Sequence, residues 1–155
     1  MSADVVIVGG GIEGAAAAWA LSQRGVTNSV VTERNTVGAG MTGKSSGIVR
    51  CHYGVSSLAA MAAVGLEVFE KGQEIFGTDI GFRQTGYVVG VGEGDALSLR
   101  SSLAAQRAVG VQTEEIGAGE AARLWPHADL TAFEAFAWEA RGGYGDAYRD
   151  RKSVV

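Results

Sequence analysis

The stretch Asp4–Gly14 constrains the fold more than any other part of the chain, and it reads D-V-V-I-V-G-G-G-I-E-G. The β-branched residues at 5–8 predict a strand that is buried on both faces. Gly9, Gly11 and Gly14 follow as G-x-G-x-x-G, and a run of small apolar residues then predicts a helix. In this pattern the first glycine turns the chain, the second lets a pyrophosphate approach the backbone, and the third lets the helix pack on the sheet. The stretch therefore predicts a dinucleotide-binding turn.

A second predicted strand, Ser29–Thr32, strengthens this interpretation because an acidic residue follows it. Glu33 lies 19 positions after Gly14, close to the spacing of about 20 at which an acid binds the ribose of a dinucleotide. The alternative is a glycine-rich turn before an ordinary helix, with Glu33 as a solvated loop charge. The order of strand, glycines, helix, strand and acid favours the nucleotide site.

Composition and charge exclude several classes of protein. The chain has 155 residues, 46% of them hydrophobic, and a net charge of −4, so we expect a folded core and no nucleic-acid partner. A single cysteine, Cys51, excludes an internal disulfide framework. We expect no signal peptide and no membrane span, which predicts a cytoplasmic protein. We predict no metal site.

The remaining pattern predicts helices and strands in alternation. Helices are expected at 12–24, 56–76, 95–109 and 119–125, and strands at 81–91, 111–116 and 132–139. The stretches 34–47 and 142–146 are rich in glycine and predict loops. The change of pattern after the long helix suggests that an insertion interrupts a nucleotide-binding layer.

Several segments together resemble a known family. They are V-V-I-V-G-G-G-I-E-G near the start, E-R at 33–34 and G-A-G-M-T-G-K-S-S-G-I-V-R-C-H-Y at 38–53. They resemble the D-amino-acid oxidase-like FAD-dependent oxidoreductases, in particular the branch of glycine oxidase, sarcosine oxidase and dimethylglycine dehydrogenase. Later, G-Y-V-V-G at 86–90 is similar to the first strand of that family's substrate domain, and G-G-Y-G-D at 142–146 to the segment that returns to its FAD domain.

The resemblance implies a fold and a division of the chain. The fold would be α/β, with a Rossmann-like βαβ FAD-binding layer of the glutathione-reductase type and an inserted α+β portion of a substrate domain. Residues 1–80 would begin the FAD-binding domain, 81–140 would be a partial substrate domain, and 141–155 would begin the return. Because the family is longer, the resemblance implies a truncated N-terminal fragment, which we expect to be poorly soluble or loosely folded and to bind FAD weakly.

The resemblance also implies which residues bind FAD. The glycine turn would hold the pyrophosphate, Glu33 the adenosine ribose, and the loop at 38–48 would pass over the pyrophosphate towards the flavin. Hydroxyl groups and backbone amides are what a pyrophosphate and a polyol bind, and a simple NAD domain does not need such a loop after its second strand. The implied cofactor-binding residues are Gly9, Gly11, Ile12, Gly14, Glu33, Arg34, Gly40, Thr42, Ser45, Ser46 and Gly47.

The next segment carries the implied catalytic residues Arg50, His52 and Tyr53. Arg50 stands where the branch places a cation near the flavin, and a positive charge there favours the reduced anionic ring. The alternative for Arg50 is a surface arginine. His52 and Tyr53 could line the active site, although a single histidine is more often a packing or surface residue. Cys51 is expected to be a small buried hydrophobic residue.

Three functions remain open at this point. The first is a FAD enzyme that oxidises the C–N bond of a small amine or amino acid such as sarcosine, glycine or dimethylglycine, with oxygen or another electron acceptor. The second is an NAD(P)-binding dehydrogenase domain, against which the loop at 38–48 argues. The third is a non-catalytic fragment that binds a nucleotide.

Overall fold

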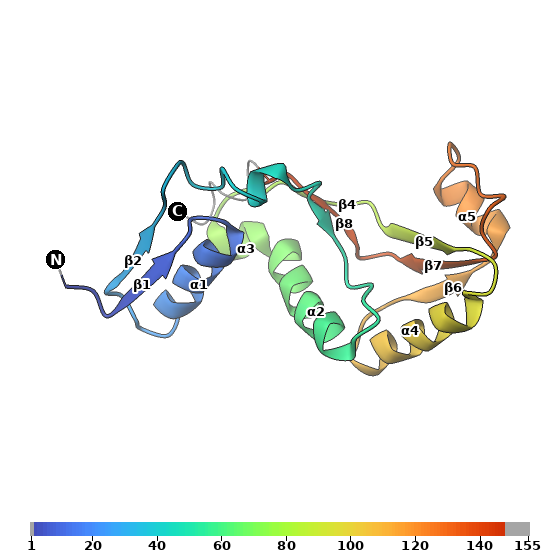
Figure 1. Cartoon of the computed structure of the whole chain (residues 1–155), viewed down its shortest axis with the longest axis horizontal. Helices are drawn as coiled ribbons and strands as arrows, with labels where there is room; N and C mark the ends of the chain where they lie inside the picture. Colours follow the sequence, from blue (N-terminus) through green and yellow to red (C-terminus); the bar gives the residue numbers. More distant parts are fainter. Residues whose placement is uncertain (1, 148–155) are drawn as a thin grey trace. The chain divides into compact units, whose positions relative to one another are not determined.

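A computed structural model describes residues 2–147 of the chain, which has a mixed α/β fold (Figure 1). In chain order the elements are β1 Val5–Val8, α1 Ile12–Ser22, β2 Ser29–Thr32, the 3-10 helix η1 Thr42–Lys44, β3 Ile48–Val49, α2 Ser56–Glu70, α3 Gly72–Phe76, β4 Phe82–Gln84, β5 Tyr87–Val91, α4 Ala96–Ala108, β6 Glu114–Ile116, α5 Ala118–Leu124, β7 Ala135–Glu139 and β8 Gly143–Gly145. The strands form sheets with the orders β1-β2, β3-β8-β4 and β5-β7-β6. Among the described residues, no helix has the length and apolar character that a membrane crossing needs.

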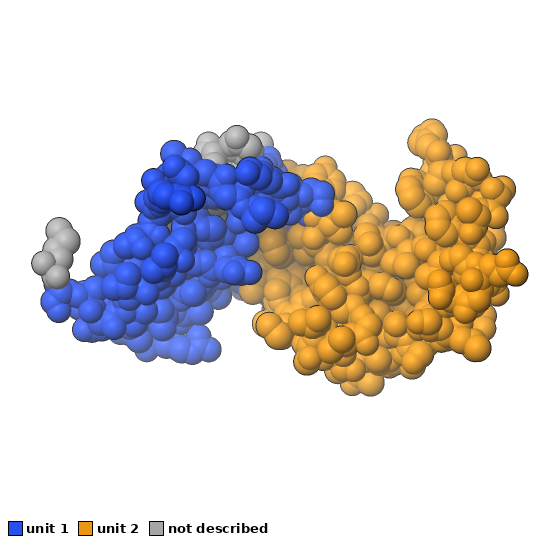
Figure 2. All heavy atoms as spheres, viewed as in Figure 1, with its two compact units in different colours: residues 1–47, 71–82, 145–155 blue, residues 48–70, 83–144 orange. Residues whose placement is uncertain are grey.

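The chain divides into two compact units, which Figure 2 shows in blue and orange. Unit 1 comprises residues 1–47, 71–82 and 145–155, and unit 2 comprises 48–70 and 83–144. The functional domain boundaries expected near 80 and 140 stay a prediction, and the last residues of the expected return segment, 148–155, lie outside the described part of the chain.

Unit 1 is built on a parallel βαβ unit. β1 pairs with β2 in parallel along both full strands, and α1 connects them. The predicted glycine turn is present: Gly9 has a φ of +109°, which residues with a side chain rarely adopt, and its amide donates to the Thr32 carbonyl at 2.8 Å. Trp19 of α1 packs against Phe76 of α3, with ring centroids 5.6 Å apart.

The prediction that the first strand is buried on both faces is wrong for the described chain. Val6 is 58% exposed and Val8 is 87% exposed, whereas Val5 and Ile7 are partly buried. β1 pairs with β2 alone, and alternate side chains of a strand point to opposite faces. A run of β-branched residues therefore indicates a strand without indicating how many layers cover it.

Two further predictions are wrong in detail. The helix expected at 56–76 is two helices, α2 and α3, because the backbone leaves the helical conformation at Lys71, where φ is −94° and ψ is 12°. Gly72 follows, and glycine is a poor helix former. The stretch 142–146, predicted as a loop, contains β8, which pairs antiparallel with β3. Backbone groups alone make this ladder, so it needs no apolar side chains.

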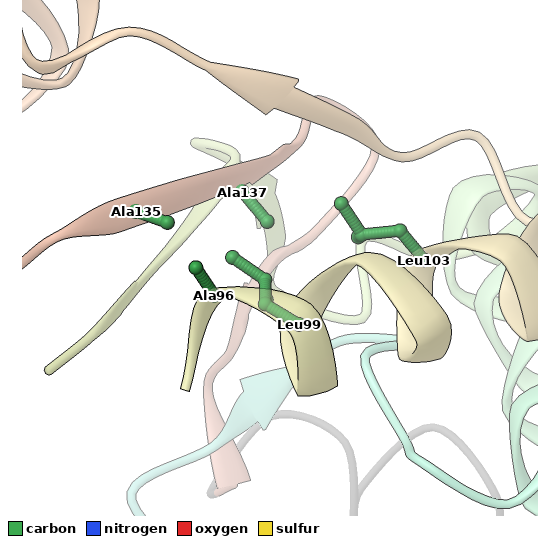
Figure 3. Close-up of a cluster of buried hydrophobic side chains, with 5 residues drawn as sticks. All are labelled: Ala96, Leu99, Leu103, Ala135 and Ala137. Carbon is green, nitrogen blue, oxygen red and sulfur yellow. The ribbon is translucent and has the colours of Figure 1, made fainter. Parts of the chain in front are cut away.

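Unit 2 has its core around the central strand β7. β5 and β6 flank β7 in antiparallel pairing. One cluster fills the face between β7 and α4 and consists of Ala96, Leu99, Leu103, Ala135 and Ala137 (Figure 3). A second cluster lies against α5 and consists of Ile116, Ala121 and Phe136. Because β7 is covered on both faces, its last residue, Glu139, is also carried into the interior, where it is 2% exposed.

The close approach of α1 to the glycine turn gives a stability prediction. A Cβ at Gly14 would lie 2.0 Å from the backbone oxygen of Gly9, so Gly14→Ala must displace the helix from the turn. We expect the free energy of unfolding to fall by about 1–3 kcal/mol, as measured by urea titration.

Gly65→Ala in α2 is the matched control for this substitution. A Cβ at Gly65 meets no atom within 4 Å, and alanine is favoured over glycine inside a helix by about 0.5–1 kcal/mol. The control should therefore raise stability. A Gly14→Ala variant that is also stabilised would contradict the close packing of α1.

Candidate functional site

The residues predicted to bind a nucleotide meet at the carboxyl ends of β1 and β2. Val8, Gly9, Thr32, Glu33 and Arg34 line a pocket of about 580 Å³. In α/β sheets with parallel strands, ligands bind outside these carboxyl ends. The pocket is therefore where the sequence pattern predicts the nucleotide.

Glu33 is tied to the glycine turn through its carboxylate. Its Oε2 accepts the Gly10 amide at 2.8 Å, and its Oε1 accepts the Asn35 amide at 2.8 Å. The hydrogen bond from the Asn35 amide, followed by the one from the Gly10 amide, holds the pKa of Glu33 below its usual value. The exposed carboxylate is therefore ionised at neutral pH. Each oxygen has a further lone pair. Glu33 can therefore accept hydrogen bonds from the hydroxyl groups of a ligand while it holds the Gly10 amide of the glycine turn.

The loop predicted to pass over the pyrophosphate lies against the start of α1. Thr42 Oγ1 accepts the Ile12 amide at 3.0 Å, and the Gly38 amide donates to the Gly10 carbonyl at 2.8 Å. The first amides of a helix have no partner within the helix and attract anions. A Cβ at Gly11 would lie 3.1 Å from Thr42 Oγ1. Any side chain at Gly11 would therefore fill the space beside these amides.

Within the described part of the chain, no hydrogen bond joins the other predicted cofactor residues of this loop, Gly40 and 45–47, to the glycine turn or to the start of α1. The Gly47 amide donates to Ser45 Oγ at 3.0 Å, and the Gly47 carbonyl accepts the Gly145 amide at 2.7 Å. Gly40, Ser45 and Ser46 are exposed. The structure thus brings Gly9, Glu33 and Arg34 to one pocket, with Gly11, Ile12 and Thr42 at the start of α1, but it does not place 45–47 in the lining of that pocket.

The predicted catalytic residues lie in unit 2, in the irregular segment 50–53. The Arg50 guanidinium carbon lies 4.5 Å from the ring centroid of Tyr53 and 5.5 Å from that of Tyr87. Its Nη1 also donates to the His52 carbonyl. Two aromatic faces and a carbonyl hold the cation in place, and Arg50 is partly buried.

Two buried polar side chains that sequence reasoning missed hold this segment. Glu139 accepts the Cys51 amide on Oε1 at 2.7 Å. Gln106, which is 0% exposed, donates from Nε2 to the Tyr53 carbonyl at 3.2 Å. The same nitrogen lies 3.4 Å from Nδ1 of His52. The segment is therefore anchored by one side chain from β7 and one from α4.

Both anchors left a signal in the sequence. Glu139 falls on the face of β7 that its buried alanines share, as the two-residue period of a strand requires. Gln106 follows Leu99 and Leu103 at helical spacing on the buried face of α4. A buried polar group costs stability unless it has a partner. A polar residue at a core-facing position is therefore a signal of a specific role.

Burial shapes the ionisation of this segment. Burial raises the pKa of Glu139, although the amide of Cys51 opposes the shift. Burial and the neighbouring Glu139 raise the pKa of the Cys51 thiol to about 12. Burial, reinforced by the charge of Arg50, lowers the pKa of His52. At neutral pH the imidazole is therefore neutral and the thiol is protonated, as suits the small buried residue that the sequence predicts.

Glu139→Ala tests the anchor on β7. The substitution leaves the buried Cys51 amide without its acceptor, so we expect the free energy of unfolding to fall by about 1–3 kcal/mol. Urea titration measures this change. An unchanged stability would show that the Cys51 amide finds another partner.

Glu139→Gln separates the hydrogen bond from the charge, because glutamine keeps an oxygen for the amide. The folded-state pKa of Glu139 is raised, so its contribution to stability is present below the usual value of 4.5 and is lost as the pH rises through the folded-state pKa. The free energy of unfolding of Glu139→Gln should therefore rise relative to that of the wild type as the pH rises above 4.5. A stability difference that does not change with pH would contradict the raised pKa.

Comparison with known proteins gives matches over most of the chain. Residues 4–149 match the family described as DAO, FAD dependent oxidoreductase. Over 124 residues the chain is 31% identical to 4-methylaminobutanoate oxidase (formaldehyde-forming) of Paenarthrobacter nicotinovorans, a match that covers 78% of this chain and 15% of that protein. Over 51 residues it is 45% identical to sarcosine oxidase subunit beta of Rhizobium meliloti (strain 1021), covering 32% of this chain and 12% of the relative.

The fold also matches a solved structure closely. The crystal structure of L-proline dehydrogenase from P. horikoshii is similar with a TM-score of 0.89 and 25% sequence identity, over 99% of this chain and 40% of that one. The chain therefore spans less than half of the solved protein, and the matches to the two curated relatives cover 15% and 12% of their lengths.

Proposed function

The chain belongs to the family of FAD-dependent oxidoreductases, and from this premise we propose that it binds FAD and serves the oxidation of the C–N bond of a small amine or amino acid. The observation that carries the proposal is the meeting of the glycine turn, Glu33 and the Thr42 loop at one end of the parallel strands. The family match favours FAD over NAD(P). In this proposal residues 1–80 begin a Rossmann-like FAD-binding layer, and residues 81–140 supply the inserted substrate-domain portion.

The residues of unit 1 fit a dinucleotide. The pocket beside Glu33 has a volume of about 580 Å³, and the ionised carboxylate offers acceptors for ribose hydroxyls. Thr42 Oγ1 accepts the Ile12 amide, and a hydroxyl that accepts one hydrogen bond can still donate its own proton to a phosphate oxygen. We assign Glu33 to the adenosine ribose, with Arg34 beside it. We assign the remaining predicted cofactor residues to the pyrophosphate and ribityl chain: Gly9, Gly11, Ile12, Gly14, Gly40, Thr42, Ser45, Ser46 and Gly47.

The substrate side of the proposal rests on Arg50, His52 and Tyr53. Bound FAD supplies the acceptor for the hydride that leaves the substrate. Arg50 is a fixed cation, which can stabilise developing negative charge or bind a carboxylate. Tyr53 holds that cation through its ring. The relatives named as oxidases of 4-methylaminobutanoate and sarcosine support the class of small amines, among which sarcosine, glycine and dimethylglycine are the first to test. Oxygen or another acceptor completes the cycle.

Gly11→Val tests the nucleotide site. A Cβ at Gly11 already lies 3.1 Å from Thr42 Oγ1, so the branched side chain of valine fills the space beside the helix amides. We expect FAD affinity to fall at least tenfold, which corresponds to about 1.4 kcal/mol, in a titration followed by flavin fluorescence. Gly65→Ala, in α2, should bind FAD as the wild type does. A folded Gly11→Val protein with unchanged affinity would remove Gly11 from the site.

Glu33→Ala tests the ribose contact. The variant loses an ionised acceptor, so FAD should bind more weakly, whereas FMN carries no adenosine ribose and should bind as before. Both affinities are measured by the same titration. Equal losses for FAD and FMN would show that Glu33 acts only through the glycine turn, whose Gly10 amide it accepts.

The reaction itself is tested by mixing the FAD-loaded protein with N-methylated amines and amino acids in the absence of oxygen. Loss of the flavin absorbance on mixing supports C–N oxidation. A flavin that none of these compounds bleaches would contradict the catalytic part of the proposal and leave a nucleotide-binding chain.

A further inference from the structure

We propose that Gln106 is a positioning residue that holds His52 in one tautomer, with Nδ1 unprotonated and the proton on Nε2. In this state His52 is a hydrogen-bond donor towards a ligand and not a proton acceptor. The catalytic meaning of the inference rests on the proposed function, because His52 belongs to the substrate side. Its geometry rests only on contacts within unit 2.

The Tyr53 carbonyl decides which way the Gln106 amide faces. A backbone carbonyl can only accept a hydrogen bond, and it lies 3.2 Å from Nε2 of Gln106. The flipped amide would set its oxygen against the carbonyl oxygen at a side chain that is 0% exposed, where no bulk water reaches it. The amide orientation therefore follows from the backbone, independently of the imidazole.

The orientation of the amide then decides the protonation of His52. The Gln106 Nε2 carries two hydrogens, and one of them serves the Tyr53 carbonyl. The nitrogen also lies 3.4 Å from Nδ1 of His52. A proton on Nδ1 would place two donors face to face, so Nδ1 must be the acceptor. A neutral imidazole with an unprotonated Nδ1 carries its proton on Nε2.

The charged groups around His52 agree with this assignment. Arg50, on the same segment, donates to the His52 carbonyl and disfavours a second positive charge beside it. Glu139, on β7, accepts a hydrogen bond from the Cys51 amide, and Glu70, on α2, is a second acid whose charge acts on Cys51. Burial, followed by Arg50, lowers the pKa of His52. The imidazole is therefore held neutral as well as oriented.

The cost of Gln106 at its position supports a specific role. Figure 3 shows Leu99 and Leu103 on the buried face of α4, and Gln106 is a buried residue of the same helix at helical spacing from both. Its Oε1 is buried and has no hydrogen-bond partner among residues 2–147, which destabilises the fold. A leucine would avoid that cost. The contacts of Gln106 Nε2 with the Tyr53 carbonyl and with His52 Nδ1 are therefore what glutamine provides here and leucine would not.

The two histidines make a direct test possible. The chain contains only His52 and His127, and His127 is exposed. Long-range proton–nitrogen NMR spectra of protein labelled with nitrogen-15 histidine therefore show the imidazole of interest beside an internal reference. We expect His52 at neutral pH to have an unprotonated Nδ1 and a protonated Nε2. A spectrum in which Nδ1 carries the proton would overturn the proposal.

Gln106→Leu then tests the cause of the preference. Leucine has no donor for Nδ1, so we expect His52 to lose its single tautomer and to show both, while the signals of His127 stay unchanged. Gln73→Leu, at an exposed position of α3, is the matched control and should leave the His52 spectrum as in the wild type. A folded Gln106→Leu protein with the wild-type tautomer would overturn the role of Gln106.

The NMR experiment still tests the proposal if the Gln106→Leu variant does not fold or if the chain binds no FAD. If Gln106→Leu does not fold, the wild-type spectrum alone tests the tautomer that the geometry requires. The measurement also uses neither FAD nor an amine. A chain that binds no FAD would therefore contradict the proposed function and leave the tautomer result to be judged separately.

Discussion

The hydrogen bond between the Glu33 carboxylate and the Gly10 amide is the contact on which the proposed nucleotide site depends. Glu33 directly follows β2 and the glycine turn directly follows β1, so this contact of 2.8 Å joins the ends of both strands, together with the Gly9 amide that donates to the Thr32 carbonyl. A bond to an ionised acceptor is stronger than one between neutral groups. The Gly38 amide then joins the Gly10 carbonyl at 2.8 Å, which attaches the following loop to the same turn. Contacts within the protein thus support the geometry proposed for FAD.

In unit 2, too, polar side chains hold an irregular backbone segment through hydrogen bonds. Its segment 50–53 forms no helix or strand of its own, yet it carries the residues assigned to the substrate. Glu139 from β7 and Gln106 from α4 hold it through one amide and one carbonyl. Functional groups on irregular segments keep a precise geometry when rigid elements support them. In unit 2 the anchoring polar side chains lie on β7 and α4, and in unit 1 Glu33 directly follows β2; in both units such a side chain fixes the backbone of an irregular segment.

The parts of the fold that the sequence predicted are those that depend on neighbouring residues. The first strand, the glycine turn, the helix and Glu33 are close in sequence, and each is marked by its own residue type. Predictions failed where distant partners decide the outcome, as with the exposure of Val8 and the backbone pairing of β8. Glu139 and Gln106 contact residues 88 and 53 positions away. Their polar character at buried positions was visible, but their partners could not be identified from spacing.

The burial of Cys51 gives the protein a built-in reporter. The chain has one cysteine, it is 1% exposed, and its thiol has a pKa of about 12. Thiol reagents attack the thiolate at an accessible sulfur, so the folded protein offers them no target. Alkylation of Cys51 therefore proceeds only through openings that release the segment from β7, and its rate counts those openings. The residue between Arg50 and His52 thus records how often segment 50–53 separates from β7.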